Sequence, residues 1–269
     1  MAQPTNDMSF LDHLEELRWH LVRSFFAIVI VAIAVFAFSS FVYEHFLLAH
    51  LSGDFPTYKL MCKLMSSFGS ESDFCNINFK NDLQNLKLTG QIMNLIWTSM
   101  ILGLIVAFPY VLWEMWRFIS PGLHKHERKK SRRFIFYASV LFFTGVLFSY
   151  YVIAPISIFF FYTFEITPLI ENHFTFESHI GMVTNTLIGV SLMFELPVIM
   201  YFLTKMGLVT PEFLKRYRKV ALVLVLTLSA IITPPDIASQ IIVTIPVMLL
   251  YELSIFISKK VVKNEQNNA

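Results

Sequence analysis

Residues 92–111 read IMNLIWTSMILGLIVAFPYV, a run of twenty residues without a charged side chain. A helix that spans a membrane needs about 20 predominantly apolar residues, so this run predicts a transmembrane helix. Comparable apolar runs lie on both sides of it, at 21–42, 134–164 and 180–203. The pattern indicates an all-α, polytopic membrane protein.

The composition of the 269-residue chain supports this class. It is 55% hydrophobic and 15% charged, whereas a typical soluble domain is about 25% charged. The formal net charge of +2 provides little surface for neutralising nucleic-acid phosphates. The composition therefore excludes a disordered chain and a nucleic-acid-binding protein, and it disfavours a soluble enzyme.

Two shorter apolar runs, 220–232 and 237–251, flank the turn Thr233-Pro234-Pro235-Asp236. Thirteen helical residues reach only about 20 Å, less than a hydrocarbon core of about 30 Å. Two short spans or a re-entrant hairpin would both fit this pattern. We favour two spans, six in total, because lysine and arginine lie at both outer ends of the pair.

Cations gather in three places that would face one side of such a membrane: 114–133, 205–219 and the tail 259–269. The positive-inside rule then predicts a single integral membrane domain with both termini cytoplasmic. Residues 1–20 form an amphipathic cytoplasmic start, and 52–89 form a long outer loop. The residues before Leu21 do not resemble a signal peptide, so the first span should be retained.

Both cysteines, Cys62 and Cys75, lie in the predicted outer loop. A disulfide is chemically allowed on the outer side of a membrane, and closing this loop would add about 3 kcal/mol of stability. Two free thiols are the other interpretation, and the residues alone leave the choice open.

The chain carries no Gly-rich phosphate loop, Gly-x-Ser-x-Gly elbow or His-Glu-x-x-His helix. We therefore expect no enzyme, no cofactor and no metal site. Without a nucleotide site, any work that the protein does must draw on a partner or on the membrane gradient.

Four acidic residues stand in unusual places: Glu16 in the amphipathic start, Glu127 in the first basic loop, Glu195 inside the fourth run, and Asp236 after the two prolines. From spacing alone, Glu16 and Glu127 would simply pair with neighbouring arginines, such as Arg18. Asp236 would cap the helix that follows it. Glu195 should face protein or water, because a charge at the centre of a span is costly.

Several short motifs in this order resemble the TatC family, the multispanning signal-peptide receptor of the twin-arginine protein translocase. They are His13-Leu14-Glu15-Glu16-Leu17-Arg18, the segment 116–123, Lys125-His126-Glu127-Arg128, Phe194-Glu195-Leu196-Pro197, and Thr233-Pro234-Pro235-Asp236 with Gln240. The resemblance covers almost the whole chain and implies six helices, the fifth and sixth short, in a curved, concave arrangement.

The resemblance implies that the protein binds Arg-Arg signal peptides at its cytoplasmic face. Glu16 and Glu127 match the positions that the family uses for this contact, and we expect Arg18 and His13 on the same surface. A guanidinium presents a planar fork of donors that suits a carboxylate, whereas lysine cannot reproduce the bidentate geometry. The resemblance thus favours peptide binding over the ion-pair interpretation.

The resemblance also assigns roles to residues of the spans and outer face. Glu195 would hydrate or thin the membrane, or would touch the signal peptide or a partner helix; a protonated acid bonded to a neighbouring span is the plain alternative. Asp236 is a secondary functional site beside its capping role. Thr233 and Gln240 flank the edge at which single-span partners dock in the family.

As a TatC-like component, the protein would act in the inner membrane of a bacterium within a multimeric complex. Its partners would be the signal peptides of folded cargo, small single-span proteins of the TatA and TatB type, and membrane lipids. The proton-motive force would supply the energy for export. The alternative from another class is a proton-coupled small-solute transporter that uses Glu195.

Overall fold

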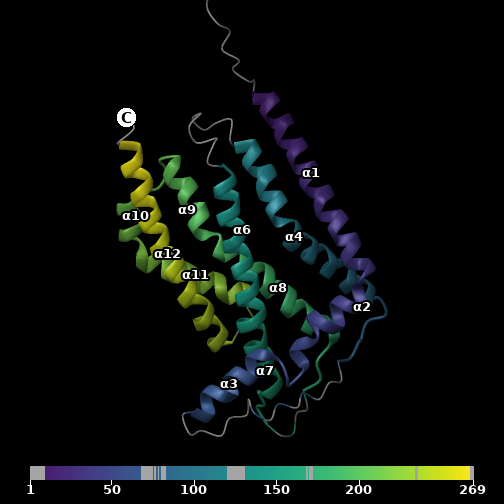
Figure 1. Cartoon of the computed structure of the whole chain (residues 1–269). Helices are drawn as coiled ribbons and strands as arrows, with labels where there is room; N and C mark the ends of the chain where they lie inside the picture. The colour runs from purple at the N-terminus through teal and green to yellow at the C-terminus, as the bar shows by residue number, and fades with distance from the viewer. Residues whose placement is uncertain are drawn as a thin grey trace, which may run out of the picture. The chain divides into compact units, whose positions relative to one another are not determined.

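The computed structural model describes residues 10–67, 75, 77, 79, 83–119, 131–167, 169, 172–233 and 236–266. Within these ranges the regular elements are helices, as predicted (Figure 1). The α-helices are α1 (Phe10–Ala37), α2 (Ser39–Val42), α3 (Pro56–Ser67), α4 (Gly90–Ile119), α6 (Ser131–Phe148), α7 (Ala154–Thr163), α8 (Phe176–Phe194), α9 (Leu196–Lys205), α10 (Pro211–Arg216), α11 (Arg218–Ile232) and α12 (Ile237–Gln266). Short π and 3-10 turns, η1 (Tyr43–Leu47), η2 (Ala49–Leu51) and η5 (Ser149–Ile153), join some of them.

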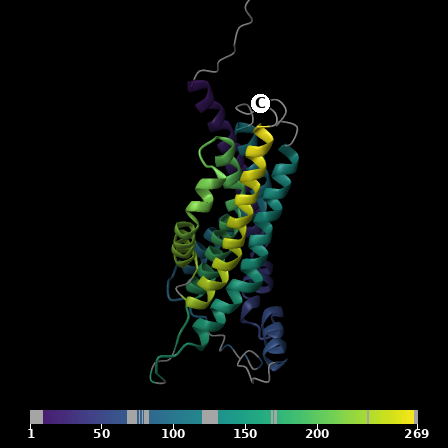
Figure 2. The same ribbon diagram turned by 90° about the vertical axis from the view of Figure 1, so that its left-hand side faces the viewer.

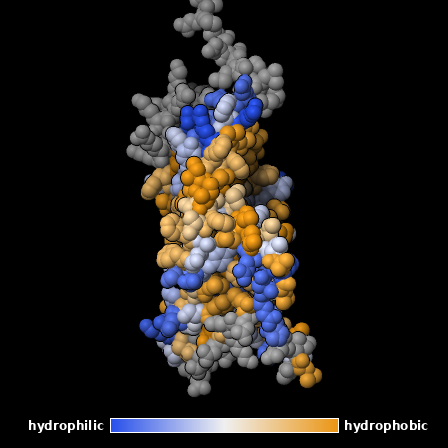
Figure 3. Space-filling model, turned by 90° about the vertical axis from the view of Figure 1, so that its right-hand side faces the viewer, coloured by the Kyte–Doolittle hydropathy of each residue, from blue (hydrophilic) through white to orange (hydrophobic). Residues whose placement is uncertain are grey.

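Five helical segments of the described chain are long and apolar enough to cross a membrane: 15–37, 90–119, 134–163, 176–205 and 238–263. They correspond to five of the six predicted spans. The remaining one, α11, has 15 residues and is short, as predicted. Large apolar side chains such as Ile30 and Phe38 are well exposed, which suits contact with lipid. Figure 3 shows such apolar residues covering much of one face.

Two element boundaries differ from the prediction. Helix α12 has 30 residues and does not end near Tyr251, so the sixth span is not short. Its second half contains good helix formers and no proline, and therefore the helix continues although the apolar run stops. Helix α1 begins at Phe10, which makes the amphipathic start and the first span one continuous helix.

The chain forms two compact units, 1–38 with 99–139 and 39–98 with 140–269. In the first unit, α1 packs closely against the later part of α4. A β-carbon at Gly103 would lie 2.8 Å from the carbonyl oxygen of Ile28 and 3.0 Å from the backbone nitrogen of Ala32. The absence of a side chain at Gly103 therefore allows the two helix backbones to approach, as small residues do in membrane proteins.

In the second unit, α12 packs along α9 and α11, which Figures 1 and 2 show from two directions. Its apolar core is built from buried side chains of α8, α11, α12 and η5: Ile153, Val190, Met193, Phe194, Val225, Val243 and Val247. A smaller cluster of Leu214, Tyr251 and Ile255 joins α10 to α12.

Pro155 interrupts the hydrogen bonds of the third span, as its position predicts. Proline has no backbone N–H, so carbonyls in the preceding turn lose their helical partner. The chain forms the π turn η5 here, and side chains from the first loop supply the missing donors. The Thr57 hydroxyl donates to the Tyr151 carbonyl, and His50 Nε2 lies 3.0 Å from the Tyr150 carbonyl oxygen.

Tyr58 completes this contact between the first loop and the third span. It is fully buried, and its hydroxyl lies 3.1 Å from the carbonyl oxygens of both His50 and Pro155. Burial raises the pKa of the Tyr58 hydroxyl and lowers the pKa of His50, so both groups are held in their neutral forms. The first half of the predicted outer loop is thus a packed cap.

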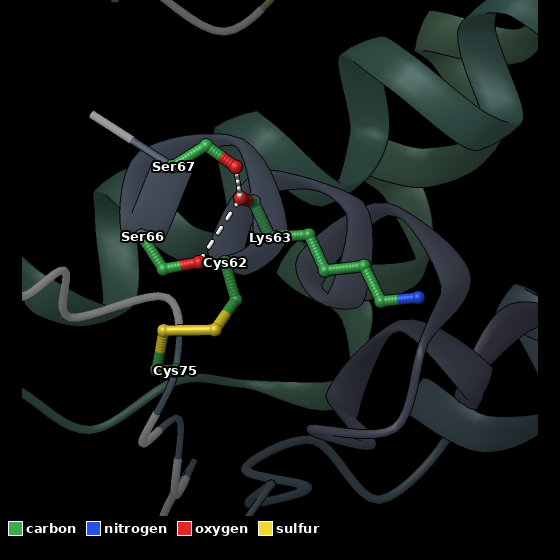
Figure 4. The surroundings of a disulfide bond; sticks show 5 residues. All are labelled: Cys62, Lys63, Ser66, Ser67 and Cys75. Carbon is green, nitrogen blue, oxygen red and sulfur yellow. Dashed lines mark hydrogen bonds between the residues drawn. A yellow bond between two sulfur atoms is a disulfide. The ribbon is translucent and has the colours of Figure 1, made fainter. Parts of the chain in front are cut away.

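The rest of this loop is tied at two further points. Cys62 of α3 and Cys75 form a disulfide, shown in Figure 4 beside the hydrogen bonds from Ser66 and Ser67 to the Lys63 carbonyl. Gln84 pairs in a single β-bridge with Thr175, the N-cap of α8. The sequence left open whether the two cysteines are free or bonded, and in the structure they are bonded.

Candidate functional site

The predicted cytoplasmic end of α1 carries a cluster of polar side chains, beginning with Glu16. Its side chain is 36% exposed, and its Oε1 lies 4.0 Å from Nε2 of His20, one helical turn later. Within the described residues Glu16 forms no ion pair with Arg18, which is exposed. Residues two apart on a helix point in different directions, so the simple Glu16–Arg18 pair does not form.

His20 joins α1 to α4 through a short, buried contact. Its Nδ1 lies 2.5 Å from Oε2 of Glu114, whose side chain is only 1% exposed. The other carboxylate oxygen, Oε1, lies 3.4 Å from Nη1 of Arg117, and the side chain of Tyr110 also hydrogen-bonds this carboxylate. The buried Glu114 carboxylate therefore has polar partners from both helices.

Neither His20 nor Glu114 was among the site residues expected from the sequence. The predicted basic loop begins at residue 114, but α4 continues to Ile119, and the buried Glu114 carboxylate has its partners inside the fold. The sequence signal that was available is the spacing of Glu16 and His20, which places an acid and a histidine on one face of an amphipathic helix.

A surface pocket of about 420 Å³ opens at this end of the first unit. Its lining residues are Glu16, Trp19, His20, Arg23 and Arg117. Trp19 is 58% exposed. The pocket therefore combines one partly exposed carboxylate, two guanidinium groups and an indole face.

Two of the other residues predicted for this surface lie wholly or partly outside the described part of the chain. Glu127 lies outside the described residues, as do all positions from 120 to 130. His13 belongs to α1, but its side chain is outside the described part. Thus the structure places Glu16 and Arg18 on α1. The joint binding of a signal peptide by Glu16 and Glu127 stays a prediction.

Glu195 lies at the break between α8 and α9. The break occurs here because Pro197, in the first turn of α9, cannot donate a backbone hydrogen bond. Glu195 is 6% exposed, and neither of its carboxyl oxygens has a hydrogen-bond partner within the described residues. The predicted alternative, a hydrogen bond to a neighbouring span, is not present in the described part of the chain.

Asp236 is buried at the start of α12 and acts as its cap. Its Oδ1 accepts a hydrogen bond of 2.6 Å from the backbone N–H of Ser239. Its Oδ2 lies 3.4 Å from the hydroxyl of Ser157, which in turn lies 2.6 Å from the Ser239 hydroxyl. This network links α7 to α12 and gives Asp236 a structural role.

Thr233 and Gln240, the predicted partner-docking residues, both bond to α11. The Thr233 hydroxyl donates to the Ser229 carbonyl at 2.8 Å, and the Gln240 amide donates to the Leu226 carbonyl at 2.9 Å. Thr233 also lines a pocket of about 500 Å³ with residues of α7 and α8, including Tyr162 and His179.

Comparison with known proteins places this architecture. The sequence pattern of the family described as Sec-independent protein translocase protein (TatC) matches residues 12–246. The chain is 39% identical over 266 residues to the TatC protein of Blattabacterium sp. subsp. Periplaneta americana (strain BPLAN), covering 98% of this chain and 100% of that one. It is 31% identical over 264 residues to TatCy of Bacillus subtilis (strain 168), covering 98% and 94% of the two chains.

Solved structures give the same result. A crystal structure of the twin-arginine translocase receptor TatC superposes with a TM-score of 0.70 at 31% sequence identity. The match covers 93% of this chain and 99% of that chain. A second crystal structure of this receptor, in the detergent DDM, matches with a TM-score of 0.68.

Proposed function

Because this chain belongs to the TatC family of Sec-independent protein translocase components, we propose that it is the subunit that binds Arg-Arg signal peptides of folded cargo. As a Tat translocase component it is a bacterial membrane protein that works in a complex with other Tat proteins.

One observation carries the proposal: Glu16 presents a partly exposed carboxylate to an open pocket and forms no ion pair with Arg18. A carboxylate is the natural acceptor for a guanidinium fork. The exposed indole of Trp19 lines the same pocket and offers a face on which a guanidinium can stack. Glu16 and Trp19 together suit an arginine better than a lysine.

Glu127 is the second carboxylate of the proposal. It follows the end of α4 at Ile119 by eight residues, and the α1–α4 contact at His20 and Glu114 brings the end of α4 beside Glu16. Two adjacent arginines need two acceptors that are held apart, and Glu16 and Glu127 would supply one each. Arg18 and His13 would border this surface.

Photo-crosslinking of a signal peptide tests the recognition step. A photoreactive residue at Trp19 should capture a peptide with the Arg-Arg pair and should capture its Lys-Lys counterpart only weakly. A photoreactive residue at the exposed Lys59, which pairs with Asp54 in the predicted outer loop, is the matched control and should capture neither. Equal capture of both peptides at residue 19 would contradict recognition of guanidinium groups.

We also propose that Glu195 takes part in transport by contacting groups that lie outside this chain. Its carboxyl is buried and unpartnered within the described residues, so its partner would be water, the signal peptide or a helix of another subunit. Glu195→Gln should reduce export while leaving the capture of the Arg-Arg pair at residue 19 intact. Normal export by this variant would contradict the proposal.

Small single-span partners of the TatA and TatB type would dock near Thr233 and Gln240, and the proton-motive force would drive export. The pocket beside Thr233 supports this placement. Cysteines introduced at residue 240 and along a partner helix should form crosslinks there.

Cysteine labelling of residue 263 from the cytoplasmic side only would support the proposed orientation of the C-terminus in the inner membrane.

A further inference from the structure

The pocket at the α1–α4 end contains charges of both signs, which a receptor for arginine alone does not need. Glu16 supplies one carboxylate, whereas Arg23 and Arg117 supply two guanidinium groups. Both arginines are exposed. Their positive charges would repel an arginine peptide from their part of the pocket, so this part fits a different ligand group.

The pocket lies at the edge of two membrane-spanning segments. Arg23 belongs to the first part of the span 15–37, and Arg117 lies two residues before the end of the span 90–119. Trp19 and Trp113 are 58% and 43% exposed beside them, as expected of aromatic residues at the level of lipid headgroups. The headgroup of a phospholipid lies at this level of the membrane.

The two arginines are suited to a phosphate. The Arg117 guanidinium lies 5.1 Å from the ring centre of Trp113, which restrains its orientation. Its contact with Glu114 Oε1 is 3.4 Å long, and a planar guanidinium matches the geometry of a phosphate. Basic pockets between transmembrane helices on the cytoplasmic side are known to bind the phosphate groups of lipids such as cardiolipin.

We propose that this pocket binds the headgroup of phosphatidylethanolamine while no signal peptide is bound, and that an incoming Arg-Arg peptide displaces the lipid from Glu16. Its phosphate would contact Arg23 and Arg117, and its primary ammonium would donate to Glu16. An anionic lipid without an amine would place no cation against Glu16. A choline headgroup carries a cation without N–H donors, so it cannot hydrogen-bond the carboxylate.

Native mass spectrometry of the full chain tests this without any signal peptide, so its result is independent of the proposed receptor function. The protein in detergent is mixed with equal amounts of phosphatidylethanolamine, phosphatidylglycerol and phosphatidylcholine that have the same acyl chains, and it is then purified from this mixture. We expect phosphatidylethanolamine to be retained in preference to the other two. Equal retention, or preference for phosphatidylglycerol or phosphatidylcholine, would overturn the proposal.

Variants assign the binding to the pocket. Arg23→Gln should lower retention of phosphatidylethanolamine about fivefold, corresponding to about 1 kcal/mol for one basic residue at a membrane surface. Glu16→Gln should abolish the preference for phosphatidylethanolamine over phosphatidylglycerol. Arg216→Gln, which removes an exposed cation from α10 outside the pocket, is the matched control and should change nothing.

Thermal unfolding of each variant verifies that it is folded. If Arg23→Gln fails to fold, Arg23→Lys replaces it, and this variant should keep the phosphate contact and most of the retention. Unchanged lipid preference in folded Glu16→Gln, or equal losses in Arg216→Gln and Arg23→Gln, would show that the lipid binds elsewhere.

Discussion

Nδ1 of His20 lies 2.5 Å from Oε2 of Glu114, and this contact joins α1 to α4 one helical turn after Glu16. Both side chains are buried, at 8% and 1% exposure. A buried polar group that loses its partner costs free energy, so each of these residues depends on the other. The pair therefore fixes the surface on which the proposed signal-peptide contact is built.

The first prediction follows from this dependence. Glu114→Ala leaves His20 without its buried partner and should lower the free energy of unfolding by about 1–3 kcal/mol. Glu114→Gln keeps an oxygen acceptor for Nδ1 and should cost less. Unfolding by detergent titration measures both. Equal losses in the two variants would show that the hydrogen bond is not what stabilises this region.

The second prediction concerns the close approach of α1 and α4. Gly103→Ala places a β-carbon against the backbone of Ile28 and Ala32 and should destabilise the protein by about 1–3 kcal/mol through overpacking. Gly181→Ala is the matched control, because the added carbon meets no atom within 4 Å outside its chain neighbours and the backbone of its own helix. Alanine has the higher helix propensity, so this control should gain up to about 1 kcal/mol. Similar melting temperatures for the two variants would refute the packing argument.

The third prediction uses the pH dependence of His50, which donates to the carbonyl left open by Pro155. Burial lowers the pKa of His50 in the folded protein, so the unfolded chain binds the proton more readily. Stability from this residue is fully present above about pH 6.5 and is lost as the pH falls below that value, toward the folded pKa.

The measurement for His50 compares the wild type with His50→Gln between pH 7.5 and 4.5. The variant keeps an N–H donor for the Tyr150 carbonyl but does not titrate. Its free energy of unfolding should therefore fall less steeply with acidification than that of the wild type. Parallel pH curves for the two proteins would mean that His50 is not buried in its neutral form.

The fourth prediction concerns the disulfide of the first loop. Cys62 and Cys75 are 13 residues apart, and a loop of this size contributes about 3 kcal/mol when it is closed. Cys62→Ser should lower the stability of the outer cap by about this amount, and a reducing agent should have the same effect on the wild type. The reducing agent should have no effect on Cys62→Ser.

Much of this fold could be predicted from hydropathy alone, because the bilayer requires apolar helices of fixed length. The spans around residues 92–111 and 180–203 were predictable for this reason, and so was the irregularity at Pro155. The end of α12 was not. Its last turns are polar, and they stay helical because no residue interrupts the backbone hydrogen bonds up to Gln266.

The candidate site was predictable only in part. Glu16 could be found because it belongs to a motif at the start of an amphipathic helix. Glu114 could not, because its importance depends on a histidine 94 residues away in the sequence. The donors that serve the third span at Pro155 were hidden for the same reason, since His50 and Thr57 come from a loop without a periodic pattern.

A double-mutant cycle between Glu16 and the signal peptide tests the central claim most directly. The affinities of Arg-Arg and Lys-Lys peptides are measured by fluorescence anisotropy for the wild type and for Glu16→Gln. We expect a coupling energy of about 1.5–3 kcal/mol, because a hydrogen bond to a charged group contributes about that much. A coupling energy of zero, with Glu16→Gln weakening both peptides equally or neither, would contradict recognition of arginine by Glu16.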